Sequence, residues 1–138
     1  MNIIVTHVPV GNQDKALDFY TNKLGFIKKN DIPMGGDARW LTVVSPNNQN
    51  GVELLLEPNW NPSISINGEP AAKVYQKILF DAGIPAAVFG VDDVDAEYQR
   101  LEKLGVSFKK TPVVMGPVKL AVLDDTCGNL IQIIQMLG

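Results

Sequence analysis

The stretch VGNQDKALDFYTNKLGF, residues 10–26, has a counterpart about 80 residues later in VDDVDAEYQRLEKLGV, residues 91–106. Each copy begins where an apolar strand ends, and Asn12 and Asp93 stand at the two starts. Their short side chains can accept hydrogen bonds from the free N–H groups of a first helical turn. Each copy closes with Lys-Leu-Gly, and glycine readily takes the left-handed conformation that ends helices. The repeat therefore predicts two equivalent helices.

Apolar residues in both copies recur at the spacing of a helix that buries one side. They are Ala16, Leu17, Tyr20 and Leu24 in the first copy and Val94, Tyr98, Leu101 and Leu104 in the second. Strands are expected after each helix, because apolar stretches there alternate with turns rich in Pro, Asn, Asp and Gly. They fall at residues 27–32, 41–44 and 52–55, and again at 108–113, 120–123 and 131–134. Each copy is thus a βαβββ module.

The sequence predicts an α+β protein whose residues 1–138 form one domain of two tandem modules. Module one covers residues 1–58, a connector covers 59–83, and module two covers 84–138. The connector is expected to begin as a loop and to carry an extra helix from Pro70 to Ala82. Proline suits a first helical turn, and Gly83 suits the position just past the end of the helix.

The composition excludes several classes of function. The 12 basic and 15 acidic residues give a net charge of -3 with no basic run, so neither nucleic acid nor an anionic membrane surface is an expected partner. The apolar stretches fall far short of the roughly 20 residues that span a bilayer. The single cysteine, Cys127, cannot form an intramolecular disulfide, and residues 1–5 resemble a strand rather than a signal peptide. A cytoplasmic location is therefore expected.

Side chains alternate along a strand, so each expected strand has a side facing the helix and an open side. The helix-facing set is Thr6, Val8, Val10, Leu41, Val43, Val52, Leu54, Leu56, Ile131 and Ile133. The open set is Val5, His7, Pro9, Trp40, Thr42, Glu53, Leu55, Glu57, Leu130, Gln132 and Ile134, together with Ala86, Val88 and Gly90 from the repeat of the first strand. We expect His7 to point toward Glu53 on this open face.

Residues 10–20, 24–26, 89–95 and 124–132 closely resemble the vicinal-oxygen-chelate superfamily, which includes glyoxalases, bleomycin-resistance proteins and extradiol dioxygenases. The resemblance covers nearly the whole chain. It implies paired βαβββ modules that curl into an open, eight-stranded half-barrel with a ligand on the concave face. It also implies a homodimer, the state of many members of the superfamily.

The resemblance further implies where a metal would be bound, because the metal enzymes of the superfamily take ligands from the first and fourth strands of each module. The matching positions are Val5, Glu53, Ala86 and Gln132. Glu53 is a strong ligand for a divalent ion and Gln132 a weak one, whereas valine and alanine cannot coordinate. We therefore expect no metal at the usual site and no cofactor. The alternative is a displaced divalent-metal site formed by His7, Glu53 and Gln132. His7 lies two residues beyond the ligand position at Val5, which is ~6.6 Å along the strand and on the same face.

Three functions are compatible with these residues. In the first, the protein binds a small molecule without metal, in a homodimer groove lined by His7, Trp40, Thr42, Glu53, Gln132 and Met115. In the second, it is a lyase, isomerase or dioxygenase that uses the displaced site, or Glu53 as a catalytic general base. In the third, it is an interaction module whose dimer surface matters more than its pocket. The sequence leaves open whether the protein is an enzyme.

Glu53 and Cys127 also have purely structural interpretations. Glu53 can serve as an ion-pair partner for Arg39 or Lys119 on neighbouring strands. Cys127 lies in an Asp-Thr-Cys-Gly-Asn sequence with no neighbouring basic residue, which indicates a turn residue rather than a nucleophile.

Overall fold

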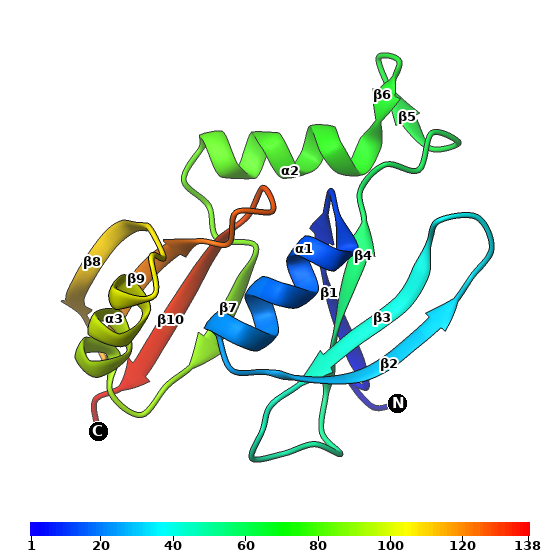
Figure 1. Cartoon of the computed structure of the whole chain (residues 1–138). Coiled ribbons are helices and arrows are strands. Elements are labelled where there is room, and N and C mark those ends of the chain that lie inside the picture. The colour runs from blue at the N-terminus through cyan, green and yellow to red at the C-terminus, as the bar shows by residue number, and fades with distance from the viewer.

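The computed structural model describes residues 1–138 as two four-stranded sheets, a small two-stranded sheet and three α-helices (Figure 1). Sheet one has the order β1-β4-β3-β2 and consists of β1 (Val5–Val10), β2 (Ile27–Pro33), β3 (Arg39–Val44) and β4 (Glu53–Pro58). Sheet two has the matching order β7-β10-β9-β8 and consists of β7 (Ala87–Gly90), β8 (Phe108–Met115), β9 (Val118–Asp124) and β10 (Leu130–Met136). The predicted repeat of a βαβββ module is confirmed, and the barrel does not close.

The two repeated helices begin and end where the sequence predicts. Before α1 (Gln13–Asp18), Asn12 Oδ1 accepts a hydrogen bond from the Lys15 N–H at 2.9 Å, and before α3 (Val94–Lys103), Asp93 Oδ1 does the same for Ala96 at 3.1 Å. Gly25 and Gly105 follow the helices with φ of 87° and 85°, a backbone conformation that other residues adopt only with strain. The first helix also widens into a π-helical segment, η1 (Phe19–Lys23), which the apolar spacing does not predict.

The main core joins the two modules. It contains 16 buried residues from both sheets and both repeated helices, and Figure 1 shows α1 in front of the gap between the sheets. The predicted helix-facing side chains in this cluster are Val8, Val10, Leu41, Val43, Leu54, Leu56, Ile131 and Ile133. Val52 was predicted among them, but it precedes β4 and is 46% exposed. Thr6 is also exposed, whereas Val8 and Val10 farther along the same strand are fully buried.

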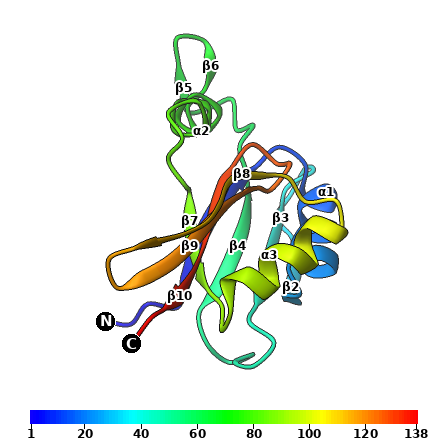
Figure 2. The same ribbon diagram turned by 90° about the vertical axis from the view of Figure 1, so that its left-hand side faces the viewer.

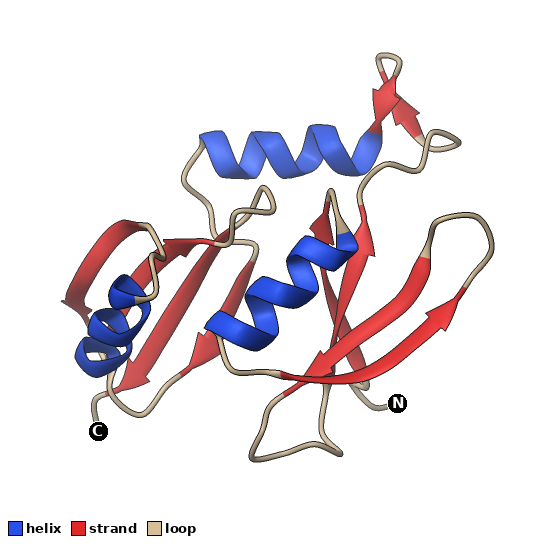
Figure 3. Cartoon of the chain, in the orientation of Figure 1, coloured by secondary structure: helices blue, strands red, loops and turns tan.

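The connector carries the predicted extra helix, α2 (Ala71–Asp81), with Gly83 beyond its end at φ 76°. Figure 2 shows α2 standing apart from the layers of the two sheets. The stretch expected to be a loop contains a short hairpin instead, β5 (Ser65–Ile66) and β6 (Glu69–Pro70), seen above α2 in Figure 3. Asn67 and Gly68 form its turn with φ of 51° and 82°, and Asn-Gly is the pair that such a two-residue hairpin turn prefers. No helix combines the length and apolar character needed to cross a membrane.

A buried polar network connects the two modules with α2. The Tyr20 hydroxyl donates to Asp125 Oδ2 at 2.6 Å, and Asn129 Nδ2 donates to the same oxygen at 2.8 Å. Asn129 also donates to the Pro9 carbonyl at 2.8 Å, and Gln76 Nε2 donates to that carbonyl at 2.8 Å. Because Pro9 lies near the end of β1 in sheet one and Asn129 directly precedes β10 in sheet two, the network fixes how the two sheets meet.

Replacing Tyr20 with phenylalanine tests this network. Burial raises the pKa of Tyr20 well above its ordinary value of 10.0, so the unfolded chain loses the phenol proton first and stability falls as the pH rises beyond about 10. Tyr20→Phe should lower the free energy of unfolding at pH 7 by about 1.5–3 kcal/mol, the usual contribution of a hydrogen bond to a charged group. The free energy of unfolding of the variant should also fall less steeply as the pH rises beyond about 10. Urea titrations at pH 7 and at higher pH measure both effects.

Tyr98→Phe is the matched control, because the Tyr98 hydroxyl donates to Glu102 on the exposed side of α3. It should leave the stability at pH 7 unchanged. Equal losses in the two variants would contradict a special role for the buried network.

Candidate functional site

The open face of sheet one carries most of the polar residues singled out in the sequence. In the parallel pairing of β1 with β4, Val5 lies beside Glu53, His7 beside Leu55 and Pro9 beside Glu57. Side chains on directly paired residues share a face, so all six point away from the buried Val8 and Leu54. Thr42 pairs with Leu55 and extends the same face onto β3.

His7 contacts Glu57 rather than Glu53. His7 Nδ1 lies 2.6 Å from Glu57 Oε2, and the two side chains are 62% and 48% exposed. The register explains why the expected partner was wrong: His7 sits beside Leu55, with one acid on either side of it along β4. The imidazole turns toward Glu57, the acid near the end of β4.

Glu53 is held by neutral donors from the neighbouring strands. Its Oε1 accepts the Thr42 hydroxyl at 2.7 Å and Asn30 Nδ2 at 2.8 Å, whereas Oε2 has no hydrogen-bond partner in the protein. Thr42 is completely buried. Asn30 was not predicted, because the pairing of β2 with β3 shifts between Lys28 and Asn30 and breaks simple alternation.

The cations considered as partners of Glu53 pair with other acids. Arg39 contacts Asp14 at 2.6 Å and Asp31 at 3.0 Å, and these hydrogen bonds raise the pKa of the guanidinium while Arg39 lowers that of Asp31. Lys119 pairs with Asp95 near the start of α3. Glu53 therefore has no cationic partner.

A cleft of about 380 Å³ opens on the same face. Both tryptophans of the chain, Trp40 and Trp60, line it together with Leu55 and Glu57. Met34, Ala38, Arg39, Pro58, Asn61 and Pro62 complete its walls. We call it the tryptophan cleft. Its mixture of aromatic and apolar walls with a few polar groups is typical of small-molecule sites.

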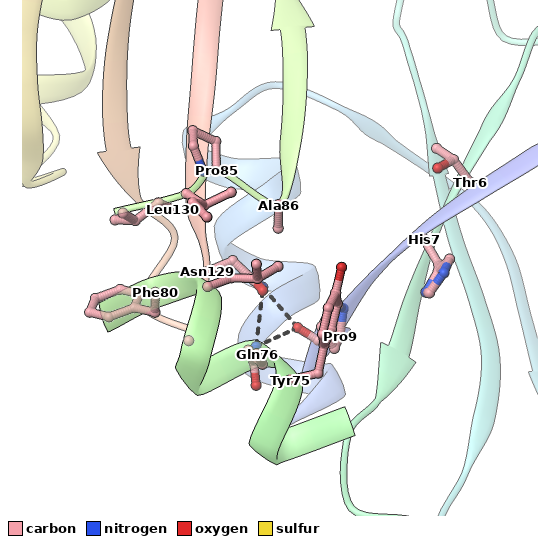
Figure 4. A pocket seen from close by; sticks show the side chains of 13 residues that line it. Thr6, His7, Pro9, Tyr75, Gln76, Phe80, Pro85, Ala86, Asn129 and Leu130 are labelled. Atoms are coloured by element: carbon pink, nitrogen blue, oxygen red, sulfur yellow. Dashed lines mark hydrogen bonds between the residues drawn. The ribbon is translucent and has the colours of Figure 1, made fainter. Parts of the chain in front are cut away.

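A second cavity, of about 340 Å³, lies between the two modules beneath α2 (Figure 4). We call it the inter-module cavity. His7 lines it from the β1 side, while Glu57, its partner, lines the tryptophan cleft. The His7–Glu57 pair therefore stands between the two cavities.

Of the six predicted ligand-binding residues, His7 lines the inter-module cavity and Trp40 the tryptophan cleft, whereas Thr42, Glu53, Gln132 and Met115 line neither. Gln132 is half-buried in β10, and Met115 is 52% exposed at the end of β8; neither lines either cavity. Gln132 pairs with Val88 of β7, and Leu130 accepts the Ala86 N–H at 2.8 Å.

No group of three or more His, Cys, Asp or Glu side chains is arranged to hold a metal ion. His7 and Glu53 form separate contacts, with Glu57 and with Thr42 and Asn30 respectively. At the four positions where the resemblance places ligands, Glu53 can coordinate strongly and Gln132 weakly, whereas Val5 and Ala86 carry hydrocarbon side chains.

Cys127 occupies a turn that Asp125 organises. Asp125 Oδ1 accepts the N–H groups of Cys127 at 2.7 Å and Asn129 at 3.0 Å. Burial, reinforced by the charge of Asp125, raises the pKa of the thiol to about 12. The thiol is thus protonated at neutral pH, which does not suit a nucleophile.

Residues 2–133 match the Glyoxalase/Bleomycin resistance protein/Dioxygenase superfamily. The chain belongs to this superfamily. An uncharacterised protein of Bacillus subtilis (strain 168), YurT, is 57% identical over 135 residues, which cover 98% of this chain and 99% of YurT. The crystal structure of UcmS2 superposes with a TM-score of 0.80 at 32% identity, over 97% of each chain.

TnmS3 from Streptomyces sp. CB03234, described as an antibiotic binding protein, is also similar in structure. It has a TM-score of 0.73 and 28% identity, over 99% of this chain and 96% of TnmS3. The superfamily and fold predicted from the sequence are confirmed.

Proposed function

We propose that the protein binds a small organic molecule on the open face of sheet one, in a groove completed by a second copy of the chain. The tryptophan cleft carries this proposal. Trp40 and Trp60 offer flat apolar surfaces for an aromatic ring, and Glu57 supplies negative charge beside them. The similarity to TnmS3, an antibiotic binding protein, supports a small molecule as the ligand.

The homodimer is supported by what the single chain leaves uncovered. β1 and β7 are the outer strands of their sheets, and neither has a hydrogen-bonded neighbour on its free edge. Ile3, Ile4, Val88 and Met136 expose apolar side chains on or next to the strands β1, β7 and β10. Exposed apolar surface beside open sheet edges is typical of association sites. A second copy can bring Gln132 and Met115 of sheet two to the groove.

Binding without the usual metal is supported by the four positions at which the resemblance places ligands, because Val5 and Ala86 carry hydrocarbon side chains and Gln132 is a weak neutral donor. Glu53 favours a second candidate function. Thr42 and Asn30 hold one carboxylate oxygen and leave the other without a donor. An oriented carboxylate with a free oxygen is suited to take a proton from a bound substrate, so Glu53 as general base is the alternative.

Isothermal titration with flat aromatic molecules tests the binding proposal, and 9-aminoacridine serves as the cationic member of the panel. Trp40→Ala should weaken binding about tenfold or more, because truncating a central aromatic anchor commonly costs that much. Tyr75→Ala removes an aromatic side chain from the inter-module cavity instead, and it should leave the affinity unchanged. Equal affinities of the wild type and Trp40→Ala would place binding elsewhere.

Elemental analysis of protein purified without chelator tests the absence of the usual metal. We expect far less than one divalent ion per chain, because a single carboxylate cannot hold one tightly. The same analysis of Glu53→Ala is the control. A stoichiometric metal in the wild type that disappears in Glu53→Ala would favour the enzyme alternative.

A further inference from the structure

We propose that the inter-module cavity is a second small-molecule site, which takes a neutral and mostly apolar molecule that carries a hydroxyl group. This site is separate from the tryptophan cleft and does not depend on the function proposed for that cleft. Its walls come from β1, from α2 with the following segment that leads into β7, and from the segment that leads into β10.

The walls of the cavity are mainly hydrocarbon. Figure 4 shows Phe80, Pro85, Ala86 and Leu130 on one side of the space and Thr6 and His7 on the other, with Tyr75 nearby on α2. Leu79 and Ile84 add further apolar surface. The volume of about 340 Å³ lies within the range of pockets that hold small ligands.

The buried amides of the cavity do not require a polar ligand. Gln76 and Asn129 are 6% and 2% exposed, and their hydrogen bonds are made within the protein. Gln76 Nε2 donates to Asn129 Oδ1 at 3.0 Å, as Figure 4 shows, and Asn129 donates to Asp125. No Lys, Arg, Asp or Glu side chain lines the space. A charged ligand would lose its hydration without gaining a counter-charge, which favours a neutral one.

His7 provides the specific polar contact. Its Nδ1 lies 2.6 Å from the Glu57 carboxylate, which can only accept, so Nδ1 carries the proton. In the neutral ring, Nε2 is then an acceptor. A ligand hydroxyl can donate to this nitrogen while its apolar body lies against Phe80 and Leu130. A phenol of moderate size satisfies both requirements.

Two-dimensional ¹H–¹⁵N NMR with 2-naphthol as the probe tests this site. We expect the backbone amides of Ala86 and Gly128 and the side-chain amide of Gln76 to shift on titration. The indole N–H signals of Trp40 and Trp60 should stay in place, because both rings line the other cleft. These signals separate the two sites, so failure of one proposal is distinguishable from failure of the other.

Three comparisons sharpen the titration. 2-Methoxynaphthalene, which lacks the donor hydroxyl, should bind about two- to tenfold more weakly than 2-naphthol. Tyr75→Ala should lower the affinity for 2-naphthol by a similar factor, because the contact with the tyrosine ring is lost. Ile78→Ala changes a side chain on α2 that is equally exposed but lies outside the cavity, and it should leave the affinity unchanged. Ala86→Leu fills the space and should abolish the shifts.

Shifts confined to the tryptophan indoles would overturn the proposal. So would unchanged affinity in a folded Ala86→Leu variant. Tyr75→Ala changes an exposed side chain and should fold normally, so unchanged 2-naphthol affinity in that variant would contradict the proposal even if Ala86→Leu failed to fold.

Discussion

The hydrogen bond from the Tyr20 hydroxyl to the Asp125 carboxylate is the contact on which the arrangement of the two modules depends. It joins residues 105 positions apart, one in the π-helical segment η1 and one in the turn between β9 and β10. Asp125 is completely buried, and burial raises its pKa against the opposing effect of hydrogen bonds from Tyr20 and Asn129. A buried carboxylate is stable only when such donors surround it, which ties the turn to the helix.

The same network determines where the connector lies. Gln76 of α2 reaches the Pro9 carbonyl and accepts a hydrogen bond from Asn59 at 2.7 Å. A side chain at Gly128 would collide with the Gln76 amide, because a Cβ there would lie 2.7 Å from Nε2. The close approach places α2 above the junction of the modules, and the inter-module cavity is the space left beneath it.

Local physical rules were sufficient to predict the framework from the sequence. Asn12 and Asp93 act within a single helical turn, and the alternation of Leu54 and Leu56 depends only on the geometry of one strand. Contacts across strands were harder, because they depend on register. A displacement of two residues preserves the face of a side chain and changes its neighbours, which is why His7 was assigned Glu53 rather than Glu57 as its partner. Asn30 was hidden by a bulge in β2.

The predicted ligand-binding residues are divided between the two four-stranded sheets of the chain. His7, Trp40, Thr42 and Glu53 gather on sheet one, while Gln132 and Met115 belong to sheet two. A groove that uses both sets needs a second chain. Sedimentation velocity tests this requirement most directly: the account predicts a particle of twice the 15.1 kDa chain mass, and dissociation on Val88→Glu at the exposed edge of sheet two. A 15.1 kDa particle that still binds 9-aminoacridine with full affinity would contradict it.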